Sequence, residues 1–440
     1  MRARLGAVAA IALSGLFLGG CSSPQLSNES VETESSESSK PSVVTATTLS
    51  ILSNVQAGTP AGDVLDAVIA TFEVNTGAKV ELVQVGEDIP IIYETSVAGG
   101  KEADIVMVNL TSNTKPWLGQ GISVPVTDFI KDWNLTDSIL PAAVEIWTDS
   151  EGRVQGFPYS GFVWPVWYNM ELLNSVGVDA PPSTMLELLY VARELREKGI
   201  APFVIGGNDW SGQKLFLQII QSYMPTEEAV DVFSTGGYCA SANAMKGINL
   251  FVQLRDEGVF IDDAEGYTAA QMNASFFEGR AAMMSAGSWA MGASPEDLRE
   301  NVVLGGLPLP SAGSAFSKPT AYQGYTGGGF FVSNNGAAEE KMPLVKEFVS
   351  LWYSPEVASS WAAATNAPNA FLGASSLDGG ITNTLTKQVV ENFYDRVEFA
   401  VMPDPLLPGG MAPEMIRQTS LAYAPGSSST AICEAIDGLY

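Results

Sequence analysis

Apolar residues between positions 47 and 110 follow two different spacings. Short runs rich in β-branched and aliphatic residues predict strands at 48–52, 80–85 and 104–108. Between the first two runs, apolar residues recur at the 3–4-residue spacing of a helix, at Val64, Leu65, Val68, Ile69 and Phe72. Gly77 is expected to end that helix. The order strand–helix–strand–helix–strand predicts an α/β fold with a parallel sheet and helices on its faces.

A second unit begins after Pro158. Thr184 and Glu187 have the spacing of a capping box, with Thr184 at the N-cap of a helix whose buried stripe is Met185, Leu188, Leu189, Ala192 and Leu195. Lys198 and Gly199 are expected to end it. A strand is predicted at 201–205, helices at 214–223, 243–257 and 271–278, and a strand at 281–285. The α/β alternation therefore continues through this unit.

The first residues are expected to form an export signal that is not part of the folded protein. Arg2 and Arg4 precede an apolar run at 5–18, which is too short to span a bilayer and is typical of a signal peptide. The run ends in Leu-Gly-Gly-Cys21, which resembles a lipoprotein signal. We therefore expect cleavage after residue 20, a lipid on Cys21, and a protein anchored on the outer face of the cell membrane. The alternative is an ordinary secretory peptide with a chance cysteine.

Residues 21–47 are rich in serine and glutamate and poor in large apolar side chains. Such a segment buries too little surface to offset its ordering entropy, so we expect a disordered tether. A flexible coil of this length spans on the order of 30 Å. No later run is long and apolar enough to predict a membrane-spanning helix.

The remaining chain of about 390 residues is long for one core, which favours two lobes. The formal net charge of the whole 440-residue sequence is −27, which argues against nucleic acid and anionic lipid surfaces as partners. The chain has no histidine, which excludes Ser-His-Asp and Cys-His catalysis and His-ligated metals. We expect no metal and no cofactor.

Cys239 and Cys433 are the only cysteines after Cys21. They are too few for a thiolate zinc or iron–sulfur site. Outside the cytosol they can form one disulfide, or they can remain two buried thiols. The sequence leaves both possibilities open.

Four stretches together resemble the family-one extracellular solute-binding proteins of ABC importers. They are FEVNTG at 72–77; GRVQGFPY at 152–159 with WYNMELL at 167–173; PPST at 181–184; and FFEGRAAM at 276–283 followed by Gly287-Ser288-Trp289. None of these stretches is specific alone. Their order and spacing fit the family over nearly the whole mature chain.

The resemblance implies a two-lobed, periplasmic-binding-protein-like α/β fold, each lobe a mixed, mostly parallel sheet flanked by helices. It implies an amino-terminal lobe of 48–158 plus 329–371 and a carboxy-terminal lobe of 163–323 plus 378–440. Three hinge crossings are expected at 157–163, 323–329 and 371–378. The glycines at 324 and 327–329 suit a hinge strand that changes φ and ψ. No GK[ST] follows them, so a phosphate-binding loop is disfavoured.

The aromatic residues near the expected cleft suit a sugar, because rings stack on its C–H faces while polar groups bind its hydroxyls. Trp289 resembles a stacking tryptophan of the family, and Trp210 is predicted in a loop after a strand. Tyr322 and Tyr325 flank the second crossing. For each of these residues a purely core role is the alternative. Trp167 and Trp361 are predicted to be core residues.

Polar candidates come from loops near the same expected cleft. Asn208 and Asp209 adjoin Trp210, and Gly287 precedes Trp289. Asn109 and Ser112 follow the strand at 104–108, and loops at the carboxyl ends of parallel strands bind ligands in open α/β sheets. Asp63 lies in the loop that opens the first helix. A solvated loop is the alternative for these positions.

The resemblance implies a monomer without enzymatic activity that captures a sugar, with an oligosaccharide expected, by lobe closure and delivers it to membrane permease subunits. A polyamine or another non-sugar solute is one alternative, although only Asp63 and Asp209 supply acids in the candidate loops. A secreted carbohydrate-active enzyme is the second, with Asp209 or Glu278 as its carboxylates.

Overall fold

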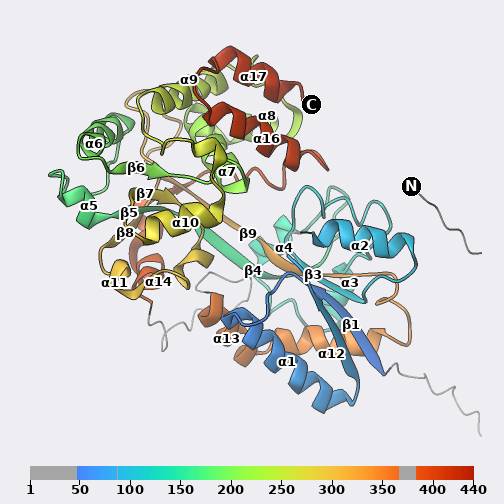
Figure 1. Cartoon of the computed structure of the whole chain (residues 1–440). Coiled ribbons are helices and arrows are strands. Elements are labelled where there is room, and N and C mark those ends of the chain that lie inside the picture. Colours follow the sequence, from blue (N-terminus) through green and yellow to red (C-terminus); the bar gives the residue numbers. More distant parts are fainter. Residues whose placement is uncertain (1–46, 87, 366–382) are drawn as a thin grey trace, which may run out of the picture. The chain divides into compact units, whose positions relative to one another are not determined.

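The computed structural model describes residues 47–86, 88–365 and 383–440 (Figure 1). The predicted signal peptide, Cys21, nearly all of the tether and the predicted crossing at 371–378 lie outside the described residues. The strands are β1 (Thr48–Ser53), β2 (Lys79–Gln84), β3 (Ile105–Val108), β4 (Phe157–Trp164), β5 (Val166–Asn169), β6 (Ala201–Val204), β7 (Ala281–Ser285), β8 (Val302–Gly305), β9 (Thr320–Val332) and β10 (Glu398–Phe399).

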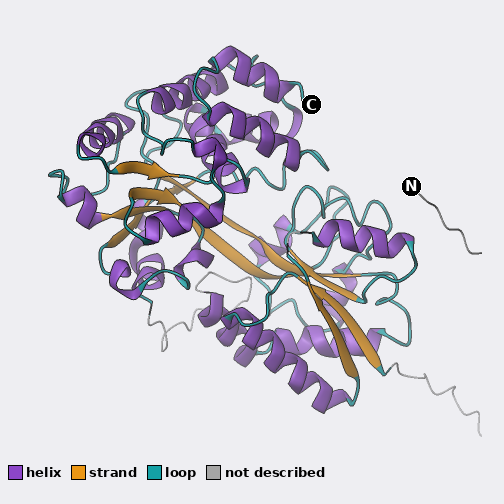
Figure 2. Cartoon of the chain, in the orientation of Figure 1, coloured by secondary structure: helices purple, strands orange, loops and turns teal. Residues whose placement is uncertain are grey.

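Helices flank these strands (Figure 2). They are α1 (Pro60–Thr76), α2 (Ile89–Ala98), α3 (Thr127–Asp132), α4 (Pro141–Ile146), α5 (Met170–Asn174), α6 (Met185–Glu197), α7 (Trp210–Ile220), α8 (Thr226–Thr235), α9 (Ala242–Asp256), α10 (Ala269–Phe277), α11 (Glu296–Arg299), α12 (Met342–Trp352), α13 (Pro355–Thr365), α14 (Thr384–Gln388), α15 (Tyr394–Arg396), α16 (Ala412–Tyr423) and α17 (Ser429–Asp437). Short helical turns are η1 (Gln221–Tyr223), η2 (Ala264–Gly266), η3 (Ser288–Met291) and η4 (Val389–Phe393).

The first sheet has the strand order β10-β9-β3-β1-β2, and β4 pairs with β9 off this path. β1 pairs in parallel with β2 and β3, and β9 runs antiparallel to β3. The predicted alternation of strands and helices over 47–110 is therefore confirmed. Thr59 caps α1 through a side-chain bond to the N–H of Gly62, and Gly77 ends the helix with a φ of 70°. α1 packs beside α12, where the rings of Phe72 and Phe348 meet edge to face.

The second sheet has the order β6-β7-β5-β8. β6 and β7 are parallel, whereas β5 is antiparallel to both β7 and β8. β6, β7 and β8 thus run in one direction and β5 runs in the opposite direction. In the first sheet, β9 likewise runs opposite to β1, β2 and β3. The two-lobed, mixed α/β fold predicted from the sequence is confirmed. The predicted capping box is also present, since Thr184 and Glu187 each bond to the other's backbone N–H at the start of α6.

Two large apolar cores accompany the two sheets. One is built from residues of the first sheet and its helices and includes Trp147, Phe331 and Trp361. The other belongs to the second sheet and includes Trp167, Phe216 and Met283. The predictions that Trp167 and Trp361 are core residues are confirmed. The exact boundaries between the two lobes stay predictions.

β4 and β9 link the two cores. They pair antiparallel from Phe157 opposite Phe330 to Trp164 opposite Tyr322, with two register irregularities near Ser160. The Phe157 end contributes to the first core. The Trp164 and Tyr322 end forms a third, small cluster. Val163 of β4 and Ala321 of β9, at this same end, belong to the second core. The pair of strands therefore contributes side chains to both cores.

The glycines of β9 serve close packing. None of the four at 324 and 327–329 has a positive φ. A Cβ on Gly328 would stand 2.9 Å from the ring of Tyr159, and one on Gly329 would stand 2.2 Å from the ring of Trp147. Rings packed against the strand thus account for glycine at these two positions, whereas the sequence suggested backbone freedom. Whether the strand also acts as a hinge stays a prediction.

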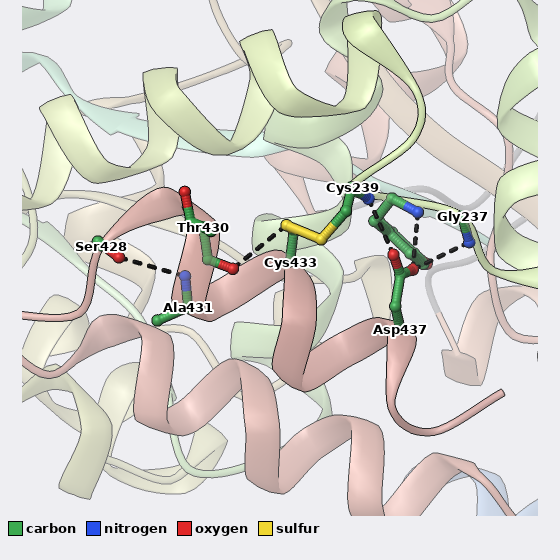
Figure 3. The surroundings of a disulfide bond; sticks show 8 residues. Gly237, Cys239, Ser428, Thr430, Ala431, Cys433 and Asp437 are labelled. Carbon is green, nitrogen blue, oxygen red and sulfur yellow. Dashed lines mark hydrogen bonds between the residues drawn. A yellow bond between two sulfur atoms is a disulfide. The ribbon is translucent and has the colours of Figure 1, made fainter.

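A disulfide holds the last helix of the chain. Cys239, which precedes α9, is bonded to Cys433 in α17, with the two Cα atoms 5.2 Å apart (Figure 3). The structure thus favours the disulfide over two free thiols. The carboxylate of Asp437, one turn further along α17, accepts hydrogen bonds from the N–H groups of Gly237, Tyr238 and Cys239 at 2.7–2.9 Å. Covalent and charged contacts therefore fix α17 to the same loop.

No helix in the described part of the chain is both long and apolar enough to span a bilayer.

We predict that replacing both cysteines, Cys239→Ser and Cys433→Ser, lowers the free energy of unfolding by about 2–5 kcal/mol, because the bond closes a long loop in the unfolded chain. Denaturant titration of the oxidised protein, the reduced protein and the double variant measures this. The reduced protein and the double variant should agree. Equal stability of the variant and the oxidised protein would show that the bond contributes nothing.

Candidate ligand-binding site

Five aromatic side chains from four separate elements form a contiguous group, here called the tryptophan cluster. β4 supplies Phe162 and Trp164, α7 supplies Trp210, η3 supplies Trp289 and β9 supplies Tyr322. The ring centroid of Trp164 lies 5.3 Å from that of Trp210 and 5.2 Å from that of Trp289. Trp210 and Trp289 are 5.7 Å apart. All three pairs meet edge to face, the geometry that aromatic quadrupoles favour.

Trp289 is the exposed member of the cluster, with 44% of its surface accessible. Its indole lies over Gly287, where a Cβ would stand 2.1 Å from the ring. Phe162 and Trp164 contact it edge to face. The predicted pair Gly287 and Trp289 is thus a single unit, in which the missing side chain of the glycine makes room for a supported, open aromatic surface.

Trp210 is the first residue of α7, which corrects the prediction that it lies in a loop. The reason is Asp209, whose Oδ1 accepts from the N–H of Ser211 at 2.9 Å and from its hydroxyl at 2.7 Å. The other oxygen, Oδ2, accepts from the N–H of Ala269 at the start of α10. Asp209 is thus an N-cap residue that also ties two helices together. Both of its oxygens are engaged by protein donors.

Asn208 is exposed beside this cap, and its own N–H donates to the carbonyl oxygen of Tyr267. The backbone around it is tightly packed. A Cβ on Gly207 would stand 2.4 Å from the carbonyl oxygen of Ala264, and one on Gly212 would stand 2.5 Å from the Cα of Gly207. The loop that presents Asn208 and Trp210 is therefore held in one conformation.

Tyr322 is fully buried beneath the cluster, and this burial raises its pKa well above the usual value. Its hydroxyl donates to the carbonyl oxygen of Lys214 at 3.1 Å and accepts from Gln221. In this structure Tyr322 therefore supports Trp164 from within. The ammonium group of Lys214 is itself buried and pairs with the carboxylate of Asp404.

Tyr325 is half-buried in the same strand, and burial raises its pKa. Its carbonyl oxygen accepts from the indole N–H of Trp147 at 2.7 Å, and its ring packs against the first core. Within the described part of the chain, its ring makes no aromatic contact with the tryptophan cluster. The structure therefore assigns Tyr325 to the first core rather than to the cluster.

Asn109 and Ser112 lie on the loop after β3. Asn109 Oδ1 accepts from the amide of Asn54 at 3.1 Å, and Ser112 is buried. Lys115 in the same loop donates to the carbonyl oxygen of Pro405 at 2.6 Å, and burial lowers the pKa of Lys115. This loop thus contacts the segment that follows Asp404, the carboxylate that pairs with Lys214.

Asp63 is exposed in the first turn of α1. It lines a hollow of about 280 Å³ between α1 and α13, together with Leu351 and Val357. No residue of the tryptophan cluster lines that hollow. The structure therefore does not bring Asp63 to the predicted tryptophans.

A larger hollow of about 450 Å³ lies where β1 and β3 begin. At its wall the carboxylate of Asp104 accepts from both the N–H and the hydroxyl of Ser50 and pairs with Lys341 at 3.0 Å. These polar groups bind one another. The hollow also lies at the edge opposite the carboxyl ends of the parallel strands, where open α/β sheets bind ligands.

The described residues include no group of His, Cys, Asp and Glu side chains that could hold a metal ion. Glu278, the other carboxylate considered for an enzyme, is exposed at the end of α10 and pairs with Arg280 at 3.0 Å. What the tryptophan cluster itself offers is aromatic surface for stacking.

Sequence reasoning placed Phe162 and Trp164 beside the first crossing without assigning them a role, and it missed Lys214. Phe162 and Trp164 are two residues apart on β4 and so share a face, which was a usable signal. The Lys214–Asp404 pair joins positions 190 residues apart, and no local pattern announces it.

Comparison with known proteins decides the family. The model of bacterial extracellular solute-binding proteins matches residues 57–359. This chain belongs to that family.

A solved structure of the family, a "probable secreted solute-binding lipoprotein" from Streptomyces coelicolor, is 37% identical, with a TM-score of 0.77 over 89% of this chain and 98% of that one. An ABC transporter extracellular-binding protein of Pyrococcus horikoshii is 28% identical over 33% of either chain. A "probable sugar-binding periplasmic protein" of Rhizobium meliloti is 25% identical over 44% of this chain and 50% of that protein. This chain therefore spans a third to a half of the curated relatives that it matches.

Membership in the extracellular solute-binding family confirms the resemblance predicted from the sequence. The family is one of extracellular binding proteins, which implies export. In this family member, the rigid loop at Asp209 and the pair Gly287–Trp289 place two indoles side by side at the surface of the second lobe.

We predict that Asp209→Ala lowers the free energy of unfolding by about 1–3 kcal/mol, because it removes a helix cap and leaves the N–H of Ala269 unpaired. Denaturant titration measures the loss. Asn208→Ala, one residue away and exposed, is the matched control and should leave stability unchanged. If the two variants are equally stable, the hydrogen bonds of Asp209 do not contribute to the stability of the fold.

Proposed function

We propose that the chain is the lipid-anchored substrate-binding protein of an ABC importer, and that it captures a sugar, most simply an oligosaccharide, at the tryptophan cluster. The observation that carries this proposal is the exposed indole of Trp289, supported by Phe162 and Trp164 and adjoined by Trp210. Flat apolar surfaces of this kind complement the C–H faces of sugar rings. The name of the Rhizobium meliloti relative supports the same ligand class.

The polar surroundings also favour a neutral ligand over a polyamine. A polyamine needs several free carboxylates, but Asp209 is engaged as a cap and Asp404 is paired with Lys214. Asp63 lies in a separate hollow. Asn208, exposed beside Trp210, is suited to bind hydroxyl groups.

An enzyme is the weaker alternative. Glycoside hydrolysis needs two carboxylates flanking the scissile bond. Asp209 has both oxygens bonded within the protein, and Glu278 pairs with Arg280 on the surface. This supports a protein that binds and releases its ligand unchanged.

Transport follows from ligand capture by two lobes. Contacts of one ligand with both lobes stabilise the closed form to the extent that the ligand prefers it. The closed protein, a monomer, then docks on permease subunits in the membrane. An affinity of roughly nanomolar to micromolar suits this role, which corresponds to about 8–12 kcal/mol.

We predict that mono- and oligosaccharides raise the melting temperature, because a ligand that binds only the native state stabilises it. Trp289→Ala and Trp210→Ala should each weaken binding of the best sugar by about 2 kcal/mol, or about 30-fold, in isothermal titration calorimetry. Tyr190→Ala, which removes an exposed ring on α6, is the control and should bind normally. Melting shifts only with polyamines or metals would contradict the sugar, and products formed from the oligosaccharides would contradict a binding role.

We predict that Cys21→Ala, at a position outside the described residues, leaves sugar affinity unchanged and releases the protein from the membrane. The lipid and tether act only by keeping the binding protein near its permease, where they raise its effective concentration. Cell fractionation, sugar uptake and calorimetry on the same variant separate these effects. Retention in the membrane fraction would rule out the anchor at Cys21.

A further inference from the structure

The chain between β10 and α16, residues 400–411, has no regular secondary structure and is here called the strap. The strap starts at the tryptophan cluster. Ala400 is buried in the small core that contains Trp164, and Met402 packs against the same core. Towards the other end of the strap, Leu407 is buried in the second core. The strap thus runs along the second lobe, from the cluster to the core beneath it.

Two polar contacts anchor the strap between these ends. The main chain of Val401 is bonded twice to the side-chain amide of Gln221, at 2.8 and 3.1 Å. Further along, the carboxylate of Asp404 pairs with the ammonium group of Lys214, one turn after Trp210 on α7. The side chain of Lys214 is only 4% exposed, so moving Asp404 away would leave a buried charge without a partner, which is strongly unfavourable. The strap therefore moves with the second lobe.

A loop of the first lobe contacts the strap. Residues 111–116 follow β3 and lie between Leu110 and Trp117, which are both fully buried in the first core. From this loop, Lys115 Nζ donates a hydrogen bond to the carbonyl oxygen of Pro405 at 2.6 Å. Because the loop belongs to the first core and the strap to the second, this bond joins the two lobes.

Gly409 brings the strap close to the same loop. A Cβ on Gly409 would stand 3.1 Å from Cγ of Pro116 and 3.4 Å from the carbonyl oxygen of Ser112. Its φ is not positive, so a side chain here would press on the loop of the first lobe rather than strain the backbone. The contacts of Lys115 and Gly409 therefore form a connection between the lobes that is separate from the pairing of β4 with β9.

This second connection lies on the side of each lobe that faces the ligand. The loop after β3 stands at the carboxyl end of a parallel strand, where open α/β sheets bind ligands. The strap packs against the core of Trp164 and is held by Lys214, one turn behind Trp210. Lobe closure brings these two sides together. A bond that joins them therefore stabilises the closed arrangement relative to an open one.

We propose that the bond from Lys115 to the strap favours closure of the lobes and so raises the affinity for ligand, although Lys115 does not contact the ligand. This inference rests on the proposed function, because it concerns how the lobes close on a sugar. Only the closed fraction of the free protein makes all of the ligand contacts. Loss of the bond lowers that fraction, and the apparent affinity falls in proportion.

Calorimetry and small-angle X-ray scattering test this proposal on the full chain, free and saturated with its best-binding sugar. Lys115→Met keeps the length of the side chain and removes the donor. We expect about three- to tenfold weaker binding, the order expected for one hydrogen bond from a charged group. We also expect a larger radius of gyration for the free variant, which returns to the parent value when sugar saturates it.

Lys131→Met is the matched control. It removes an exposed lysine of α3, in the same lobe, whose ammonium group makes no hydrogen bond within the described residues. This variant should bind and scatter as the parent does. Gly409→Val repeats the test without changing charge, because its side chain pushes the strap away from the loop. Adding Lys115→Met to Gly409→Val should cause little further loss, since both act on one contact. Melting temperatures near that of the parent confirm that each variant folds.

The outcomes separate the strap from the proposed function. Weaker binding by Lys115→Met with unchanged scattering of the free protein would mean that Lys115 contacts the sugar itself, and would overturn the proposal. Equal or tighter binding by Lys115→Met would overturn it as well, and sugar binding at the tryptophan cluster would stand. Absence of sugar binding by the parent would overturn the proposed function and, with it, the role of the strap in affinity.

Discussion

The pairing of β4 with β9 is the constraint on which the other features depend. The two strands join the cores of both sheets, and their side chains change partners along the way. At one end Phe157 and Phe330 belong to the first core. At the other end Trp164 and Tyr322 form the floor of the tryptophan cluster. The rings of Tyr159 and Trp147 pack against Gly328 and Gly329, where a larger residue would collide with them.

Around that floor, two local features hold Trp210 and Trp289 in position. Asp209 caps α7 and bonds to the start of α10, which sets the position of Trp210. Gly287 leaves space for the ring of Trp289. The capped start of α7 and the supported indole of Trp289 thereby adjoin the floor formed by Trp164 and Tyr322. Binding energy can be gained at such a site from the aromatic surface that Trp289 leaves exposed.

The sequence predicted the fold well because its signals are local. Helix caps such as Thr184 and Gly77, and the alternation of apolar residues, act over a few residues and need no knowledge of the rest of the chain. The site was predicted only in part. Trp289 and Trp210 were both candidates, but their contact could not be predicted. Asp209 is a cap, Tyr322 is buried and Asp63 lies in another hollow. These roles depend on contacts between distant segments, such as Lys214 with Asp404, which spacing does not reveal.

A crystal structure of the chain with its tightest-binding sugar tests the central claim most directly. Our account predicts a sugar ring stacked on Trp289, with Trp210 alongside and the sites around Asp63 and Asp104 unchanged. A ligand bound in the hollow near Asp104 and Lys341, or in the hollow between α1 and α13, with the tryptophan cluster unaltered, would contradict it.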